Sequence, residues 1–417
     1  MTKLQRKVVS VLAAGAIVLS MATPALADTT VTITGNGSGS NNAAVVSQTS
    51  TTTVTQSNTA NVNNNVTSNA NTGGNDANYN TGGDVLVRTG AATTTTNVTN
   101  TLNSNAAQVS GCNCGSDTNV NITGNGAYST NLATPTVENT TAVDQSNTAH
   151  VNNNVTSDAK TGGNDANLNT GGTVMVGTGP ASSTSNVSTT ANANSASVGG
   201  GAGAGASSAS FVISGNGSGS NNYITGDLSN TTAVSQSNSA YIDNNVKSDA
   251  KTGGNDAKYN TGGDVIIGTG AASANATIDN MVNFNAANVD CGCTLDVLAK
   301  IAGNGASGSV LSNDPNVITL DLSNVNATDQ GNCISLDNNA NSDAKTGYND
   351  ANLNTGSVLG NDPAIMTGGA TNSTTVNNSG NVNTVGGTPF ELPLPGGSNV
   401  SLSFDIQALL AFFGMSV

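Results

Sequence analysis

The chain has 417 residues and a formal net charge of −15, and only 8% of its residues are charged. It has no tryptophan, 6 Phe and 6 Tyr, too few large side chains for the core of an ordinary globular protein of this length. The acidic balance excludes nucleic acid and anionic lipid as direct partners, because both would be repelled. Pro and charge are scarce, unlike in most disordered chains, whereas Asn, Thr, Ser, Gly, Ala and Val are abundant and suit thin stacked β-coils.

Residues 1–27 predict a signal peptide. Lys3, Arg6 and Lys7 precede an apolar run from Val8 to Met21, and Ala25-Leu26-Ala27 is a small-residue cleavage site. Removal of this segment lowers Lys plus Arg from 10 to 7 against 25 Asp plus Glu, which gives a net charge of −18. We therefore expect a secreted, extracellular protein of the cell surface.

The rest of the chain is an array of repeats. The segment Gln56–Gly83 returns at Gln145–Gly172 with 24 of 28 residues identical, and again at Gln236–Gly263 and, more diverged, at Gln330–Gly356. Periodicity of this kind is the signature of solenoid proteins. The tripeptide GNG recurs at spacings of 89, 91 and 88 residues. These landmarks divide the chain into repeat unit 1 (28–115), repeat unit 2 (116–207, ending in a flexible Gly-rich joint at Gly199–Ser210), repeat unit 3 (208–293), a diverged repeat unit 4 (294–387) and an apolar C-terminal tail (388–417).

Strict alternation within each unit predicts strands. In unit 1, one face carries Val54, Gln56, Asn58, Ala60, Val62, Asn64 and Val66, whereas the other face is Thr, Ser and Asn. Buried amides need partners, which stacked coils supply as hydrogen-bonded ladders and an isolated hairpin does not. The ladder candidates are Gln56, Asn58, Gln145, Asn147, Gln236 and Asn238. We predict an all-β fold, an elongated β-solenoid or β-helix of stacked coils, in which each unit holds roughly four coils or β-arches that advance about 4.8 Å each.

The spacing of Gln56, Asn58 and Ala60 in VTQSNTANVNNNV, together with its later copies, resembles that of curlin-type repeats. The segment GNGSGSNNAAVVSQ, from Gly35 to Gln48, is similar in character. Curlins are secreted subunits of adhesive amyloid fibres in the biofilm matrix, built from stacked strand-loop-strand coils. The resemblance implies a comparable structural role at the cell surface.

One interpretation of a recurring aspartate is a calcium site. Asp76, Asp165, Asp256 and Asp350 occupy equivalent turns, and GGNDANYNTGG has the nine-residue glycine interval of calcium β-rolls. However, only one such interval occurs in each unit, and a β-roll stacks several in succession. The alternative, which we favour, is that Asp and Asn side chains bond the backbone of their own turns. No other cofactor is expected.

The cysteines and charged pairs suggest structural roles. Export makes disulfides the first interpretation of the cysteines, and residues two apart on a strand bridge poorly, so each CxC pair is expected to link to another coil or another molecule. Zinc held by two distant CxC pairs is the alternative. Asp158 with Lys160, Asp249 with Lys251, and Asp343 with Lys345 predict weak surface ion pairs. The disulfide candidates are Cys112, Cys114, Cys291, Cys293 and Cys333, of which Cys333 is the odd one and a candidate for a cross-link between chains.

Little in the sequence supports catalysis. His150 is the only histidine, and Asn61 and Tyr241 replace it in other units, so we expect an exposed strand residue and no enzyme. Threonine runs such as Thr51–Thr55 and Thr93–Thr99 suit an ice-binding face, although Thr is also an ordinary exposed strand residue.

The sequence therefore predicts an extracellular structural β-solenoid of a cell-surface fibre, adhesin or biofilm matrix. Its partners would be further copies of itself or other surface and matrix components. The tail is too short to cross a membrane as a helix, so no membrane span is expected. The alternative function is a β-solenoid that binds ice, calcium or glycan.

Overall fold

The computed structural model describes nearly the whole repeat array. The described residues are 7–22, 29–110, 117–199, 208–290, 296–305, 316–356, 363–386, 390–393 and 399–402. They form strands and short turns and contain no helix. In this part of the chain there is accordingly no helix that could cross a membrane.

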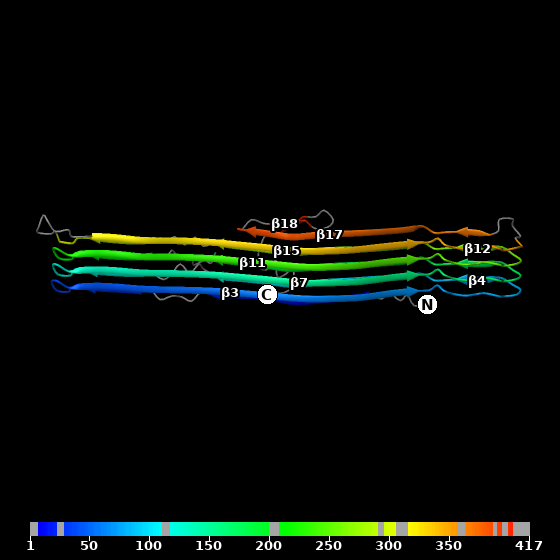
Figure 1. Cartoon of the computed structure of the whole chain (residues 1–417), viewed down its shortest axis with the longest axis horizontal. Coiled ribbons are helices and arrows are strands. Elements are labelled where there is room, and N and C mark those ends of the chain that lie inside the picture. Colours follow the sequence, from blue (N-terminus) through cyan, green and yellow to red (C-terminus); the bar gives the residue numbers. More distant parts are fainter. Residues whose placement is uncertain are drawn as a thin grey trace.

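Each repeat unit forms one complete coil, here called a rung, and the four rungs stack on one another (Figure 1). Rung 1 holds β2 (Thr29–Thr34), β3 (Asn41–Asn71), β4 (Val85–Arg88) and β5 (Ala92–Ser110); rung 2 holds β6 (Thr118–Thr123), β7 (Thr130–Lys160), β8 (Val174–Gly177) and β9 (Ala181–Gly199); rung 3 holds β10 (Ser208–Ser214), β11 (Asn221–Lys251), β12 (Val265–Gly268) and β13 (Ala272–Asp290); rung 4 holds β14 (Asp296–Ala302), β15 (Asn316–Lys345), β16 (Ala364–Met366) and β17 (Ala370–Val385).

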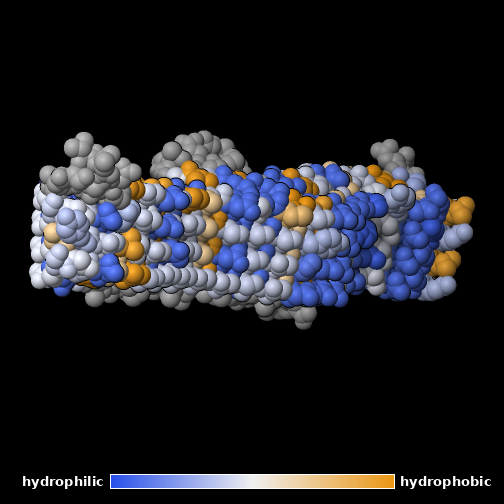
Figure 2. Space-filling model, turned by 60° about the vertical axis from the view of Figure 1, so that its left-hand side comes forward, coloured by the Kyte–Doolittle hydropathy of each residue, from blue (hydrophilic) through white to orange (hydrophobic). Residues whose placement is uncertain are grey.

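The predicted β-solenoid is confirmed. Equivalent strands of successive rungs pair in parallel and form four sheets: β3-β7-β11-β15, β2-β6-β10-β14, β4-β8-β12-β16, and β5-β9-β13-β17, with β1 (Lys7–Ala22) added outside β5. The register places repeat on repeat, so that Gln145 lies between Gln56 and Gln236. Because like residues stack, bands of similar hydropathy run across the strands on the surface (Figure 2).

The prediction of roughly four coils in each unit is wrong. A rung uses a whole unit because β3 runs without interruption for 31 residues, about 100 Å of extended chain, before the glycine turns begin. The glycine pairs lie in one loop region at the end of this strand and do not mark coil corners at short intervals. The long dimension of the molecule therefore follows the strands, whereas the stacking direction spans only four rungs (Figure 1).

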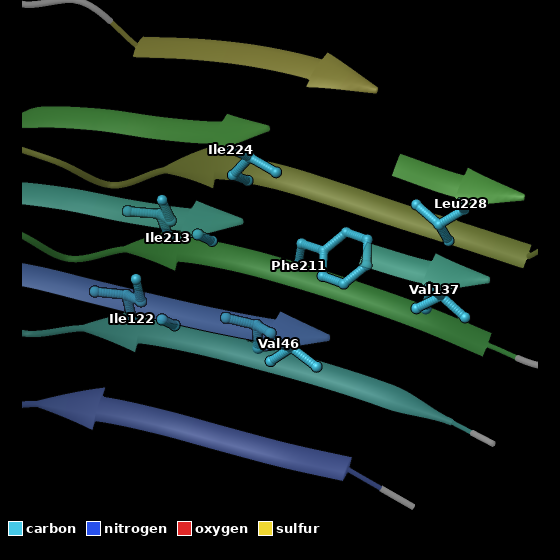
Figure 3. Packing of buried hydrophobic residues seen from close by; sticks show 11 residues of the cluster. Val46, Ile122, Val137, Phe211, Ile213, Ile224 and Leu228 are labelled. Carbon is cyan, nitrogen blue, oxygen red and sulfur yellow. The ribbon is translucent and has the colours of Figure 1, made fainter. Parts of the chain in front are cut away.

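The core lies between two layers, one of long strands and one of the shorter return strands. Val54 of β3 packs on Ala107 and Val109 of β5. Near the start of the long strands, Phe211 of β10 is the largest fully buried side chain of the described residues and packs among aliphatic residues such as Ile122 and Leu228 (Figure 3). Most remaining apolar core positions are Ala or Val, which suits the narrow space between the layers.

The loop between the long strand and the short strand that follows it, such as that between β3 and β4, is here called the first loop. Glycine permits the closest approach of rungs in this loop. A Cβ on Gly162 would lie 1.9 Å from the carbonyl oxygen of Gly253 in the next rung, and one on Gly73 would lie 2.0 Å from the carbonyl oxygen of Gly162. No side chain fits at such distances, so these positions need glycine for stacking and not for a positive φ.

Several predicted features lie at or beyond the limits of the described residues. Of the joint Gly199–Ser210, Gly199 ends β9 and Ser208–Ser210 begin β10, whereas residues 200–207 lie outside the described part. The tail contributes β18 (Phe390–Pro393) and β19 (Asn399–Leu402), an antiparallel pair. The predicted signal peptide contributes β1, whose residues Lys7 to Ala22 pair with Thr95 to Ser110 of β5; its removal stays a prediction.

Candidate functional site

Glutamines form a continuous column along the stacking direction. Gln145 donates its Nε2 to Gln56 Oε1 at 2.7 Å and to the carbonyl oxygen of Ser195 at 2.9 Å. Gln236 donates to Gln145 Oε1 at 2.8 Å, and Gln330 donates to Gln236 Oε1 at 2.7 Å. The side chains of rungs 1 to 3 are at most 2% exposed, so these bonds form away from water, where an unpaired amide would be costly.

The asparagines two residues further along join the two layers. Asn58 donates to Asn105 Oδ1 at 2.8 Å, and Asn147 donates in the same way to Asn194 Oδ1 at 2.8 Å and to Asn238 Oδ1 at 3.2 Å. The six ladder candidates therefore come together as two neighbouring buried columns on β3, β7 and β11. Side-chain bonds link rung to rung and also layer to layer.

Sequence reasoning missed further asparagine columns. Asn192 has a φ of 61°, and it donates to Asn283 Oδ1 at 3.0 Å and to the carbonyl oxygen of Ser239 at 2.7 Å. The signal that could have revealed this column is an Asn-x-Asn pattern that recurs in the return strand of every unit. Its members are Asn103, Asn105, Asn192, Asn194, Asn283, Asn285, Asn381 and Asn383.

The columns have a direction. In the central column Asn64 donates to Asn153 at 2.7 Å, Asn153 to Asn244 at 2.7 Å, and Asn244 to Asn338 at 2.7 Å, so the N–H groups point toward rung 4. The glutamine column runs the other way, with its N–H groups directed toward rung 1. Each column therefore reaches one end of the stack with an N–H group and the other end with an oxygen.

The four recurring aspartates also form a column. Asp76, Asp165, Asp256 and Asp350 pair through isolated parallel bridges in the first loop. Lys258 Nζ lies 3.1 Å from Asp256 Oδ2 and 2.9 Å from Asp350 Oδ2. The hydrogen bonds that Lys258 donates to these two carboxylates, first that to Asp350, raise the pKa of the lysine. Lys258 therefore offsets negative charge of the aspartate column in rungs 3 and 4.

Asp165, in rung 2, forms no ion pair with a lysine or arginine of the described residues. Burial, and then the charges of Asp256 and Asp76, raise the pKa of Asp165, which Lys258 lowers to a smaller extent. Asparagine bonds the backbone of its own turn, since Asn164 Nδ2 donates to the carbonyl oxygen of Thr161 at 3.0 Å. Within the described ranges no three His, Cys, Asp or Glu side chains are grouped to hold a metal ion.

Two of the three predicted ion pairs form. Lys251 Nζ lies 3.3 Å from Asp249 Oδ2, and Lys345 is paired with Asp343. Asp249 also receives Lys247 at 3.0 Å, which the sequence analysis did not anticipate. The prediction of an ion pair between Asp158 and Lys160 is wrong, because no ion pair joins these two described residues. Asp158 Oδ1 is instead buried without a hydrogen-bond partner.

The cysteines, the histidine and the threonines occupy separate places. Cys112, Cys114, Cys291 and Cys293 lie outside the described residues, and Cys333 is a free, exposed thiol on β15. His150 is exposed on β7, as expected, with its ring 6.0 Å from that of Tyr241. The threonine runs split between the two faces of their strands: Thr94 and Thr96 are buried in the core, and the outward column that begins at Thr53 continues as alanine in rungs 2 and 3.

Comparisons with family models, with curated proteins and with solved structures found no match to this chain.

Proposed function

We propose that this chain is an extracellular structural protein, a β-solenoid subunit of a cell-surface fibre, adhesin or biofilm matrix. The observation that carries the proposal is the set of amide columns that run through all four rungs and are buried in the first three. Such columns add hydrogen bonds between parallel strands at every step, as in cross-β assemblies that withstand harsh surroundings. They give rigidity to the scaffold.

The outer surface also suits a passive, exposed structure. Outward positions of the long strands are mostly Thr, Ser and Asn, as in Thr59, Ser57 and Asn61 of β3, and the chain carries a net negative charge. Small polar side chains on a strand surface bind water and resist nonspecific association with hydrophobic surfaces. Contacts with other copies or matrix components would then be confined to particular surfaces.

The test is the location of the protein and the consequence of its loss. Immunogold labelling of intact producing cells should place it outside the cell, on fibres or in the matrix, and deletion of its gene should weaken surface attachment or the matrix. Complementation with the wild-type gene should restore the phenotype, and complementation with Gln145→Ala, which breaks the glutamine column, should not. Protein confined to the cell interior, or a deletion without effect on the surface, would contradict the proposal.

The alternative function makes a different prediction. A scaffold should keep the same circular dichroism spectrum and unfolding midpoint with calcium or with a chelator. A change on calcium addition, or thermal hysteresis of ice growth by the purified protein, would favour the ligand-binding function instead.

A further inference from the structure

The last rung exposes side chains that belong to the core in the rungs before it. Ile224 is fully buried, whereas Ile318, its partner in rung 4, is 44% exposed. Exposure rises in the same way from 1% at Leu228 to 50% at Leu322. These residues face along the interior of the stack, so only another rung would cover them.

Glycines at both ends give a second, independent observation. In rung 3 a Cβ on Gly253 would lie 1.8 Å from the carbonyl oxygen of Gly347, whereas Gly347 in rung 4 has nothing within 4 Å. In rung 2 a Cβ on Gly179 would lie 2.5 Å from the carbonyl oxygen of Gly90, whereas Gly90 in rung 1 has nothing within 4 Å. Neither Gly90 nor Gly347 has a positive φ.

Neither steric contacts nor backbone conformation within one molecule therefore require glycine at these two positions. The directions of the equivalent contacts show where their missing Cβ atoms would point: that of Gly347 beyond rung 4, and that of Gly90 beyond rung 1. Both positions are shaped for a neighbouring backbone that the chain itself does not supply.

The direction of the amide columns fixes how a neighbour would sit. In the column from Asn64 to Asn338, each N–H group is directed toward rung 4. The rung 4 end of the column therefore presents N–H groups, and the rung 1 end presents oxygen. A second copy that is shifted along the stack without rotation places the oxygen end of this column against the N–H end of the first copy. The glutamine column runs in the reverse direction, and its two ends are complementary in the same way. A two-fold arrangement would bring like groups together and make the strands antiparallel.

We propose that copies of this chain stack head to tail, with rung 4 of one copy on rung 1 of the next, so that all sheets and amide columns continue across the junction. The occupant of each open end is thus a second copy of this chain. Each added copy would lengthen the fibre by four rungs, about 19 Å at about 4.8 Å for each rung. The inference rests on the proposed structural function and specifies its interface.

The leader segment bears on when stacking begins. β1 lies in parallel along β5, at the edge of rung 1 that a second copy's β17 would occupy. Stacking at that edge therefore requires that β1 be displaced or removed, so the test uses the exported protein as recovered from the cell exterior.

The experiment adds single methyl groups to the ends. Gly347→Ala and Gly90→Ala place a Cβ where the next copy's backbone would lie but meet nothing within 4 Å in the single molecule. The matched controls are Gly331→Ala in rung 4 and Gly177→Ala in rung 2, where a Cβ also meets nothing within 4 Å but does not face a stacking neighbour. All four variants should unfold as monomers at the midpoint of the wild type or slightly above it.

Assembly is followed by light scattering, sedimentation and negative-stain electron microscopy. The wild type and the controls should form fibres, whereas Gly347→Ala and Gly90→Ala should raise the protein concentration needed for assembly at least tenfold. Each end variant keeps one intact end, so a small proportion of it should also cap wild-type fibres and slow their growth.

A matched pair of charged variants separates stacking from other kinds of assembly. Leu322→Lys lies on the open end, whereas Val325→Lys lies on the outward face of the same strand, with starting exposures of 50% and 46%. Loss of fibres in Leu322→Lys alone supports stacking. Fibres that tolerate the glycine and Leu322 variants but are lost in Val325→Lys would overturn stacking in favour of lateral association, while the proposed fibre function would stand. Exported wild-type protein that stays monomeric would also overturn head-to-tail stacking. The proposed function is judged separately, by the immunogold location of the protein.

Discussion

Replacement of Gln145 by alanine would test whether the buried glutamine column stabilises the fold. The side chain makes three hydrogen bonds: it donates to Gln56 and to the carbonyl oxygen of Ser195, and it accepts one from Gln236. Loss of a buried hydrogen bond costs about 1–2 kcal/mol, so the variant should lose about 3–6 kcal/mol of unfolding free energy. That is a large part of the roughly 5–15 kcal/mol that stabilises a typical folded domain.

Two comparisons separate the column from general effects of truncation. Ser146→Ala, one residue along and on the outward face, should change the unfolding free energy by less than about 0.5 kcal/mol. Gln330→Ala in rung 4 removes only two bonds, to Gln236 and Thr384, at a half-buried position, and should cost about 1–2 kcal/mol.

Gln145→Glu keeps the shape of the side chain but removes its N–H donors at neutral pH, and buries a charge. Burial raises the pKa of the introduced carboxyl group in the folded state, so stability should recover as the pH falls through that pKa and the protonated group donates one bond again. The assay is urea unfolding followed by far-UV circular dichroism at neutral and acidic pH. Equal midpoints for Gln145→Ala and Ser146→Ala would refute a stabilising role for the column.

Three further predictions concern the first loop. Gly162→Ala, whose Cβ would lie 1.9 Å from the Gly253 carbonyl oxygen, should lower the unfolding midpoint strongly or prevent folding, whereas Gly177→Ala in the same rung should not; equal soluble yields and midpoints would show that the rungs are not so close. Because the pKa of Asp165 is raised, the folded state binds a proton more readily than the unfolded state, and the contribution of this group to stability falls as the pH rises through its raised pKa. Asp165→Asn should therefore be more stable than the wild type at neutral pH and lose this part of the pH dependence, while Glu138→Gln on an exposed strand position should do neither; a midpoint that does not rise in Asp165→Asn contradicts the assignment. Lys258→Gln removes the cation between Asp256 and Asp350, so added salt should stabilise it more than the wild type, and salt titrations with the same slope for both proteins would argue against a repulsive column.

Part of the architecture follows from the sequence because it is encoded locally. The alternation from Val54 to Val66 fixes which side chains share a face, and it does so within one strand. Recurrence of Gln56 as Gln145 and Gln236 then predicts that like residues meet once the repeats stack. The amides must be paired when buried, which is why the glutamine and asparagine columns could be anticipated.

The length of the coil could be decided only by the tertiary structure. Whether a glycine pair turns the chain or admits a neighbouring backbone depends on contacts with a residue such as Gly253, which is 91 positions from Gly162 and whose position the local sequence does not specify. The same holds for the position of Lys258 between Asp256 and Asp350, and for the Asn192 column, whose partners lie in other rungs and in the opposite layer. Local alternation sets the faces of a strand. The backbone of a rung, however, pairs with the rungs on either side of it, and that pairing exists only in the stacked fold.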